Sequence, residues 1–425
     1  MKVNETFALK GDLVFSESAK KLVTIPGGYI VCHEGIVEGT YSELPNQFRE
    51  IPIIDYGHKL ILPGLVDIHT HAPQYAFMGL GMDLELIEWL DKNTFPEEAK
   101  YKDLDYARKA YEIFTEDLLH SATTRACIFG TVHKDSTKLL MDLLEKTGLK
   151  CYVGKVNMDR NCPDNIREFR DISLQDTDRW LKETKNLYKN IMPILTPRFI
   201  PSCSDELLKE LSLIQKKYRV PLQSHLSENL SEIDWVKELC ADIKSYGEAY
   251  NRFDLFGGDV PTIMAHCIYS DEEEAKLIKE KGVFIAHCPD SNTNLSSGIA
   301  PVRKYLDMGI PMGLGTDMAA GNTNSIFRTM ISAIQVSKLR WRLVDDSLKP
   351  LRIAEAFYLG TMGGGAFFGK CGTFLKGYEL DAVVLDDEVI RHPQPLSLIN
   401  RFERAIYLSE DKHIVHKYVA GVSVF

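Results

Sequence analysis

The sequence predicts an α/β protein, a (β/α)8 TIM-type barrel accompanied by a small β-sandwich domain that is built from both chain termini. From about residue 61, apolar strand patterns alternate with amphipathic helix patterns eight times, which is typical of a parallel barrel. Short strand patterns flank this region on both sides. No G-x-G-x-x-G follows any of the strands, so an open dinucleotide-binding sheet is disfavoured.

The two chain ends have the pattern of short strands separated by turns. Residues 1–60 are expected to form the N-terminal part of the β domain, and residues 369–425 its C-terminal part. The strand patterns cover residues 6–9, 21–25, 28–33, 35–40, 51–55, 377–385 and 417–424. The N-terminal part does not have the composition of a catalytic site, and pairing between the two ends is the simplest arrangement.

Residues 61–368 are expected to form the barrel. The first predicted strand ends at His71, and the others cover residues 124–129, 150–156, 191–199, 220–225, 262–266, 283–287 and 311–317. Helical spacing of apolar residues follows Asp103, which is placed to cap that helix, and recurs in residues 271–281 and 324–341. The glycines 363–365 follow a further helical pattern and are interpreted as a loop rather than a phosphate-binding turn.

The composition excludes several classes of protein. The formal net charge is −10 and no run of Lys and Arg is visible, whereas nucleic-acid-binding proteins collect such residues into basic patches. No window approaches the roughly 18 apolar residues of a membrane span, and the N-terminus lacks the pattern of a signal peptide. The nine cysteines have no C-x-x-C spacing, which indicates reduced residues in a cytoplasmic protein. We therefore expect neither a nucleic-acid nor a membrane partner.

The first barrel strand ends in a candidate metal-binding pair. The stretch LPGLVDIHTH is an apolar strand that ends in His69, Thr70 and His71. Because side chains alternate along a strand, the two histidines point to one side and Thr70 points away. Two imidazoles placed in this way can hold one metal ion, although an H-x-H pair by itself also arises by chance.

Four further residues of metal-binding type fall at the ends of predicted strands. They are His225 on the fifth strand, His266 on the sixth, His287 on the seventh and Asp317 on the eighth. Each alone has a simpler interpretation, as a core histidine or, for Asp317, as a helix cap. Barrel enzymes place their chemistry at the C-terminal ends of their strands, so the repeated occurrence favours one catalytic site.

Residues next to these candidates suggest further roles. Glu228 follows His225 by three positions and can carry a proton between water and substrate; the alternative is a solvent-exposed acid near a helix start. Arg198 and Phe199 end the fourth strand, and Gln74 lies three residues after the first strand. A guanidinium and an amide can bind the edge of a heterocycle whose face an aromatic ring covers. Arg198 has the alternative of a structural ion pair.

Imidazole and carboxylate ligands suit Zn²⁺, which is the expected cofactor, and Fe²⁺ is not excluded. A catalytic zinc site keeps a position open for water, whose pKa the ion lowers to about 7. Binuclear barrel hydrolases commonly use a modified lysine at the end of the fourth strand, where this chain has none, and Lys155 on the third strand is interpreted as structural. One metal ion per chain is therefore expected. The role of His287 is left open.

The motifs PGLVDIHTH, SHLSE, MAHC, AHCPDSN and GLGTD occur in the order typical of the amidohydrolase superfamily, and nearly the whole chain resembles its single-metal branch. The resemblance implies that His69, His71, His225 and Asp317 bind zinc, with His266 either a further ligand or beside the metal-bound water. It also implies that Glu228 shuttles protons and that Asp317 helps to deprotonate the water. The implied substrate contacts come from His71, Gln74, Arg198, Phe199, His225, Glu228 and Asp317.

Within that branch, the stretches HAPQYAFMGLGMDLELIEWLDKNTFPEE, TPRF and GLGTDMAAG resemble those of the guanine deaminase family. The resemblance implies zinc-dependent hydrolytic deamination of guanine to xanthine and ammonia in purine catabolism or salvage, by a homodimer. Cys267 and Asp290 depart from the family pattern but remove no ligand. One alternative is a related enzyme for another aminated or halogenated heterocycle, such as 8-oxoguanine or a triazine. A more remote alternative is a non-catalytic barrel scaffold.

Overall fold

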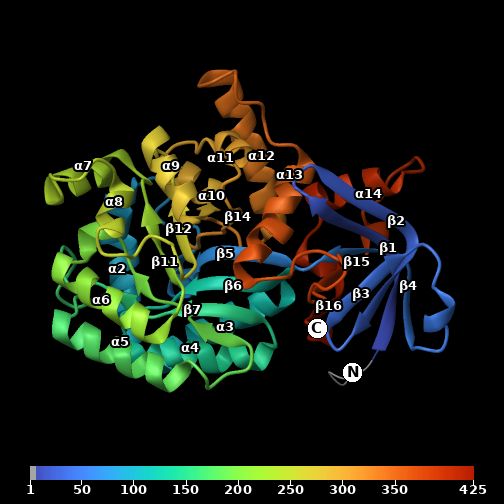
Figure 1. The fold of residues 1–425 in the computed structure, drawn as a ribbon, viewed down its shortest axis with the longest axis horizontal. Helices are drawn as coiled ribbons and strands as arrows, with labels where there is room; N and C mark the ends of the chain where they lie inside the picture. The colour runs from blue at the N-terminus through green and yellow to red at the C-terminus, as the bar shows by residue number, and fades with distance from the viewer. Residues whose placement is uncertain (1–5) are drawn as a thin grey trace.

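The computed structural model describes residues 6–425 as an eight-stranded parallel barrel surrounded by helices, with a seven-stranded sheet beside it (Figure 1). The strands are β1 (Thr6–Ser18), β2 (Lys21–His33), β3 (Ile36–Tyr41), β4 (Ile53–Pro63), β5 (Leu65–His71), β6 (Thr123–Phe129), β7 (Lys150–Gly154), β8 (Val156–Asn157), β9 (Ile191–Pro193), β10 (Thr196–Pro197), β11 (Leu222–Leu226), β12 (Thr262–His266), β13 (Phe284–His287), β14 (Met312–Leu314), β15 (Ala382–Leu385), β16 (Ile414–Val419) and β17 (Val422–Ser423). The α-helices are α1 (Leu86–Trp89), α2 (Phe95–Ala99), α3 (Leu104–His120), α4 (Lys134–Thr147), α5 (Arg170–Thr184), α6 (Asp205–Tyr218), α7 (Leu230–Leu239), α8 (Tyr246–Asn251), α9 (Glu272–Lys281), α10 (Pro289–Asn294), α11 (Val302–Met308), α12 (Ile326–Leu343), α13 (Ile353–Tyr358) and α14 (Leu398–Leu408).

The predicted barrel is confirmed, and backbone hydrogen bonds close it. Its parallel strands pair in the order β11-β12-β13-β14-β5-β6-β7-β9. A bridge between Leu195 and Leu222 joins the two ends of this order, because the Leu195 N–H donates to the Pro221 carbonyl at 2.8 Å and the Gln223 N–H donates to the Leu195 carbonyl at 2.9 Å. Closure brings the C-terminal ends of all the strands to one face.

The predicted third and fourth strands are each divided in two. Residues 150–156 form β7 and the start of β8, and residues 191–199 contain β9 and β10. Pro193 and Pro197 have no N–H to donate to a ladder, and β8 pairs with β10 as a separate parallel ladder. Arg198 and Phe199 follow β10 directly and line the pocket at the barrel mouth.

The prediction of a loop at residues 363–365 is wrong, because these glycines continue the helical turns that follow α13. A Cβ atom at Gly363 would lie 2.7 Å from the Met312 carbonyl oxygen, and one at Gly313 would lie 2.7 Å from the Cα atom of Gly364. Glycine is a poor helix former, but here it lets the segment pack directly against β14. Tertiary packing therefore outweighs the local preference.

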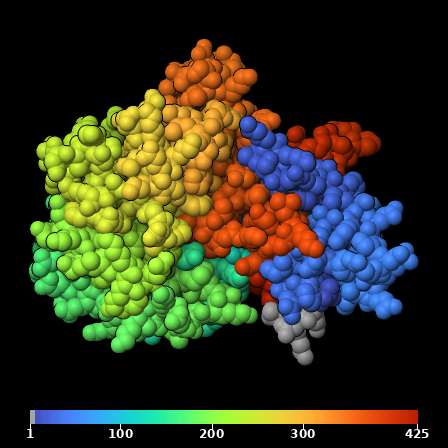
Figure 2. Space-filling model, in the orientation of Figure 1, coloured from blue at the N-terminus to red at the C-terminus, as the bar shows by residue number. Residues whose placement is uncertain are grey.

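Both chain ends build one β domain, as predicted. Its strand order is β17-β16-β15-β4-β1-β2-β3, and all seven strands belong to a single hydrogen-bonded sheet. Register shifts between β1 and β2 mark bulges, which increase the local twist of a sheet. Figure 2 shows the N-terminal strands in blue beside C-terminal segments in orange and red.

Two buried basic side chains join the β domain to the barrel. Arg125 on β6 contacts Asp381 at 2.5 Å and Glu379 at 2.8 Å. Lys417 on β16 donates to the carbonyls of Ser121 and Thr123 at 2.9 and 3.0 Å, directly after α3. Removing the carboxylates that pair with Arg125 would leave an unpaired buried charge, which is strongly destabilising. These contacts hold the sheet to the side of the barrel.

Residues 86–102, which we call the wall segment, form a helical stretch that the periodicity did not predict. It contains α1, a π-helical turn at Leu90–Thr94, α2 and a 3₁₀ turn at Lys100–Lys102. The segment ends at Asp103, whose side chain accepts from the N–H groups of Asp105 and Tyr106 as the sequence predicted for the start of α3. Over residues 6–425, no helix is both long enough and apolar enough to span a membrane.

Candidate active site

Strand β5 brings two histidines into the barrel mouth. Its side chains are buried along its whole length, and the ladder to β6 has a register shift between Asp67 and Thr70. The predicted common orientation of His69 and His71 is present, because their Nε2 atoms are 3.3 Å apart. Asp67 accepts from the His69 N–H and from the Thr316 hydroxyl, so it fixes the backbone of this strand against the chain after β14.

Strands β11 and β12 each contribute one histidine, and one nitrogen of each ring is hydrogen-bonded. The Nδ1 atom of His225 contacts the Arg198 carbonyl at 2.6 Å, and Nδ1 of His266 contacts Oδ1 of Asn292 at 2.9 Å. A carbonyl oxygen only accepts, so each Nδ1 carries the proton and donates it. The Nε2 lone pair of each ring is therefore turned into the site. Ligand histidines are commonly oriented by such outer contacts.

Asp317, beyond the end of β14, completes the group. Its backbone N–H donates to the His69 carbonyl at 2.9 Å. Its Oδ1 atom is 3.1 Å from Nε2 of His69 and 3.3 Å from Nε2 of His71, and its Oδ2 atom is 3.7 Å from Nε2 of His266. The alternative of a helix cap is not what the structure shows, since this carboxylate faces the histidines.

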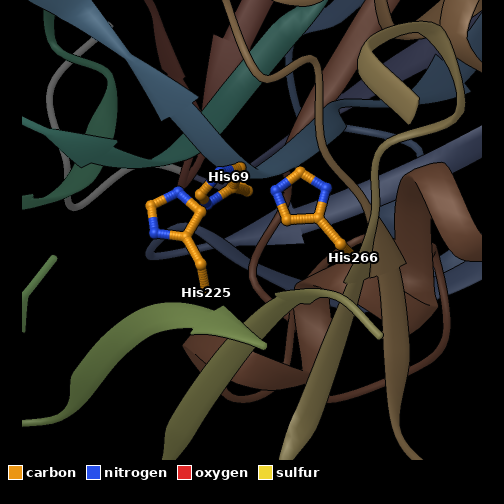
Figure 3. Close-up of side chains that lie close together, drawn as sticks. All are labelled: His69, His225 and His266. Atoms are coloured by element: carbon orange, nitrogen blue, oxygen red, sulfur yellow. The ribbon is translucent and has the colours of Figure 1, made fainter. Parts of the chain in front are cut away.

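The spacing of these donors fits one metal ion. Ligands about 2.1 Å from a tetrahedral zinc ion lie about 3.4 Å from one another, and the Nε2 atoms of His71 and His225 are likewise 3.3 Å apart. Figure 3 shows the rings of His69, His225 and His266 converging on one point. The buried Nε2 atom of His266, which faces the same point, has no protein hydrogen-bond partner among the described residues. The donor set therefore fits a cation held at its centre.

Three of the histidines, His71, His225 and His266, are in the neutral state that a metal requires. Burial lowers the pKa of His71 to about 3 and that of His266 to about 4, and it lowers the pKa of His225 well below the usual value. Burial opposes ionisation of Asp317, but the charge of His69 and the hydrogen bonds from the neighbouring histidines outweigh it and hold the pKa of Asp317 well below its usual range. Neutral imidazoles and an ionised carboxylate are the forms that bind metal.

Glu228 lies beside this group, in the turn after β11. It is buried, and its Oε2 atom is 3.3 Å from Nε2 of His266, so the alternative of a solvent-exposed acid does not hold. Burial, and after it the charge of Asp317, raises the pKa of Glu228 well above its usual value. Two neighbouring carboxyl groups whose pKa values are pushed in opposite directions are the usual basis of acid and base roles.

A pocket with about 400 Å³ of empty space, part of it open to solvent, lies above the donor group. The predicted residues Gln74, Arg198, Phe199 and Glu228 line it together with His71, His225, His266 and Asp317. Its apolar walls were not predicted and consist of Leu86, Trp89, Leu90, Leu295 and Ala320. The first three come from the wall segment, which therefore covers the site.

The model of the amidohydrolase family matches residues 60–424, which include every residue of the site. The chain belongs to the amidohydrolase family.

Relatives of this amidohydrolase are similar over most of their length. It is 36% identical to the guanine deaminase of Dictyostelium discoideum, in an alignment of 450 residues that covers 99% of each chain. It is 39% identical to the guanine deaminase of Mus musculus, over 89% of this chain and 85% of that one. The crystal structure of guanine deaminase from C. acetobutylicum with bound guanine in the active site superposes with a TM-score of 0.96 at 47% identity, over 99% of this chain and 100% of that one.

The amidohydrolase site also contains residues that the sequence did not single out. Glu98 of α2 is fully buried between Gln74 and Arg198, so the ion pair considered for Arg198 exists and the side chain still lines the cavity. Glu232 accepts from the N–H groups of Glu228 and Asn229 at 3.0 and 3.3 Å. Its position three residues after Asn229, in a capping box, is a local signal that could have revealed it.

His287 lies outside the donor group, and Cys288 lies beside it but is unsuited to bind a metal. His287 is buried, its ring nitrogens have no partner among residues 6–425, and it belongs to none of the groups whose ligand atoms converge there. The Cys288 sulfur lies near His266 and Asp317, but its thiol donates to the Ala286 carbonyl and burial raises its pKa well above the usual value. A thiol that keeps its proton is a poor metal ligand, so Cys288 is better suited to packing than to binding metal.

Proposed function

We propose that this amidohydrolase catalyses the hydrolytic deamination of guanine to xanthine and ammonia. The observation that carries the proposal is that Glu228, itself buried, lines one cavity together with the converging donors and the polar side chains of Gln74 and Arg198. The relatives named above carry the same activity in their names, and one of them holds guanine in its active site.

Zinc is the proposed metal, at one ion per chain. His69, His71, His225 and Asp317 would hold it, with His266 beside it. When bound, Zn²⁺ supplies Lewis acidity, which makes hydroxide available near neutral pH. The choice of zinc over iron rests on the compact histidine and carboxylate set and the tetrahedral spacing of its donors.

Glu228 is proposed to move the protons of the reaction. It takes a proton from the attacking water and delivers it to the ring nitrogen next to C2, while the water oxygen bonds to C2. The proton that remains on the added oxygen then goes to the exocyclic amine. The bond from C2 to that amine breaks as ammonia leaves, and the added oxygen becomes the C2 carbonyl of xanthine. His266 lies 3.3 Å from Glu228, and Asp317 lies 3.7 Å from His266. Both residues accept and hold protons on the side of the carbon that the water approaches.

Gln74, Arg198 and Phe199 are proposed to hold the purine. The amide and guanidinium hydrogen-bond the edge of the ring, and the phenyl group covers one face. The leucine and tryptophan side chains of the wall segment exclude bulk water from the reacting carbon, which strengthens each of these polar contacts.

The likeness to the guanine deaminases bears on assembly, and the free cysteines bear on location. We propose a homodimer, from the likeness to the guanine deaminases, which light scattering of the purified protein would test. We propose a cytoplasmic location and a role in purine catabolism or salvage, because all nine cysteines are free and reduced thiols are typical of the cytoplasm.

Turnover of competing heterocycles tests the proposed substrate. Protein purified without chelator is expected to convert guanine to xanthine with one ammonia released for each xanthine formed. 8-Oxoguanine and an aminotriazine, assayed in the same way, are expected to be poorer substrates. A higher kcat/KM on either of them would replace guanine as the substrate, and a protein that holds no metal and converts none of the three would support the scaffold alternative.

Glu232 provides a prediction about how Glu228 is held. Glu232→Gln leaves one side-chain oxygen for three donors, the N–H groups of residues 228 and 229 and the Tyr246 hydroxyl, which the two carboxylate oxygens now share. One buried donor is then left unpaired, at a cost of about 1–3 kcal/mol. We expect kcat on guanine to fall roughly tenfold while KM changes little, because the polar wall is untouched. The matched control is Glu238→Gln at the exposed end of the same helix. An equal loss in both variants would contradict a positioning role.

A further inference from the structure

Glu98 is the buried carboxylate that connects the two polar side chains of the pocket wall. Its side chain has no exposed surface. Oε1 accepts from Nε2 of Gln74 at 3.0 Å, and Oε2 accepts from Nη1 of Arg198 at 2.8 Å. The three residues come from three different parts of the chain, and Glu98 belongs to none of the sets assigned above to metal, substrate or proton transfer.

These contacts determine how the amide and the guanidinium face the pocket. The Gln74 nitrogen is turned to Glu98, and its oxygen accepts from the Ala319 N–H at 3.2 Å, so one N–H and one lone pair remain for a ligand. Arg198 also lies over the ring of Phe95, 5.3 Å from its centroid. Because Phe95 and Glu98 both belong to α2, the wall segment holds the groups that contact the heterocycle as well as closing the pocket over it.

Glu98 also balances the charge of Arg198. Among the described residues it is the carboxylate that hydrogen-bonds this guanidinium. The other titratable groups near the pair are His71, Cys162 and Glu228 around Arg198, and Tyr101 and Tyr111 around Glu98. Without Glu98, a buried cation would face the ligand and would favour an anion.

We propose that Glu98 is a positioning and specificity-determining residue, which orients Gln74 and Arg198 and keeps the polar wall neutral, so that the pocket prefers a neutral purine over an anionic one. This inference rests on the proposed function, because the ligands it distinguishes are guanine and xanthine. Xanthine carries a second ring carbonyl and so loses a ring proton at lower pH than guanine does. The neutral wall therefore favours release of the ionised product.

The test compares the variants Glu98→Gln and Glu97→Gln. Glu97 is the adjacent residue of the same helix, is also buried, and contacts Lys100 and Tyr106 rather than the pocket. For each protein the KM for guanine and the Ki for xanthine are measured on both sides of the first ionisation of xanthine, which is followed by its absorbance. Glu228 is present in every variant, so its own titration cancels in the comparison.

In Glu98→Gln, we expect the ratio of KM for guanine to Ki for xanthine to rise roughly tenfold on the alkaline side, the size of one charge-assisted contact. The ratio is expected to stay near the wild-type value on the acidic side, and KM is expected to rise more than kcat falls. Glu97→Gln is expected to behave as the wild type. General structural damage would weaken both ligands at both pH values, so a ratio that does not change with ionisation overturns the proposal.

The wild-type protein supplies a second measurement that does not depend on how the variants fold. Its Ki for xanthine is expected to rise as xanthine ionises, and a Ki that falls would overturn the neutral wall. Binding of guanine and xanthine can also be measured by calorimetry without turnover. A protein that binds both ligands as expected but releases no ammonia would therefore contradict the proposed function and leave the role of Glu98 standing.

Discussion

Glu228→Gln is expected to lower kcat on guanine by roughly 10²- to 10⁴-fold, the usual contribution of a positioned general acid or base. The amide has nearly the same shape as the carboxylate but cannot accept the proton that water must lose. Its backbone N–H still donates to Glu232, so the turn after β11 is expected to keep its conformation. The measurement is kcat and KM together with the metal content of both proteins.

The interpretation requires that the variant keeps its metal. Glu228 contacts His266 but is not one of the donors that converge on the metal position, so an equal metal content in wild type and variant is expected. Glu238→Gln, which makes the same chemical change on the exposed surface, controls for the removal of one charge. Retention of more than a tenth of the wild-type kcat would assign proton transfer to another group.

Removal of the metal is expected to abolish turnover altogether. A chelator leaves four imidazoles and a carboxylate facing one another with no ion between them, and hydroxide is then scarce at neutral pH because free water has a pKa of about 15.7. Because the ion binds the folded protein, its removal is also expected to lower the unfolding temperature. Addition of Zn²⁺ is expected to restore both activity and unfolding temperature.

The ligand set can be tested with a pair of histidine variants. His69→Gln removes a donor whose Nε2 atom is 3.1 Å from Asp317, and we expect its metal content to fall well below one ion per chain. His287→Gln alters a buried histidine on β13 that belongs to no converging group, and one ion per chain is expected to remain. Loss of metal in the second variant would add His287 to the ligands and answer the question that the sequence left open.

Much of the fold and of the donor set follows from local patterns. Apolar alternation and helix caps report the conformation of the residues that carry them, so the strand ending at His71, the cap at Asp103 and β12 lie where they were predicted. Strand ends in a parallel barrel share one face, so residues at those ends meet whatever the loops do. For that reason His69, His225 and Asp317 lie together as the sequence predicted.

The tertiary structure decided what encloses that group. Glu98 lies 100 positions before Arg198 and reaches it because α2 folds over the mouth, and no local pattern encodes such a contact. The helical glycines 363–365 and the divided third and fourth strands have the same origin, since contacts with distant backbone override residue preference there. The sequence by itself determined the barrel and the residues that meet at its mouth, because periodicity and strand ends are local properties. The walls, the charge balance and the orientation of the polar groups depend on packing between segments far apart in the chain.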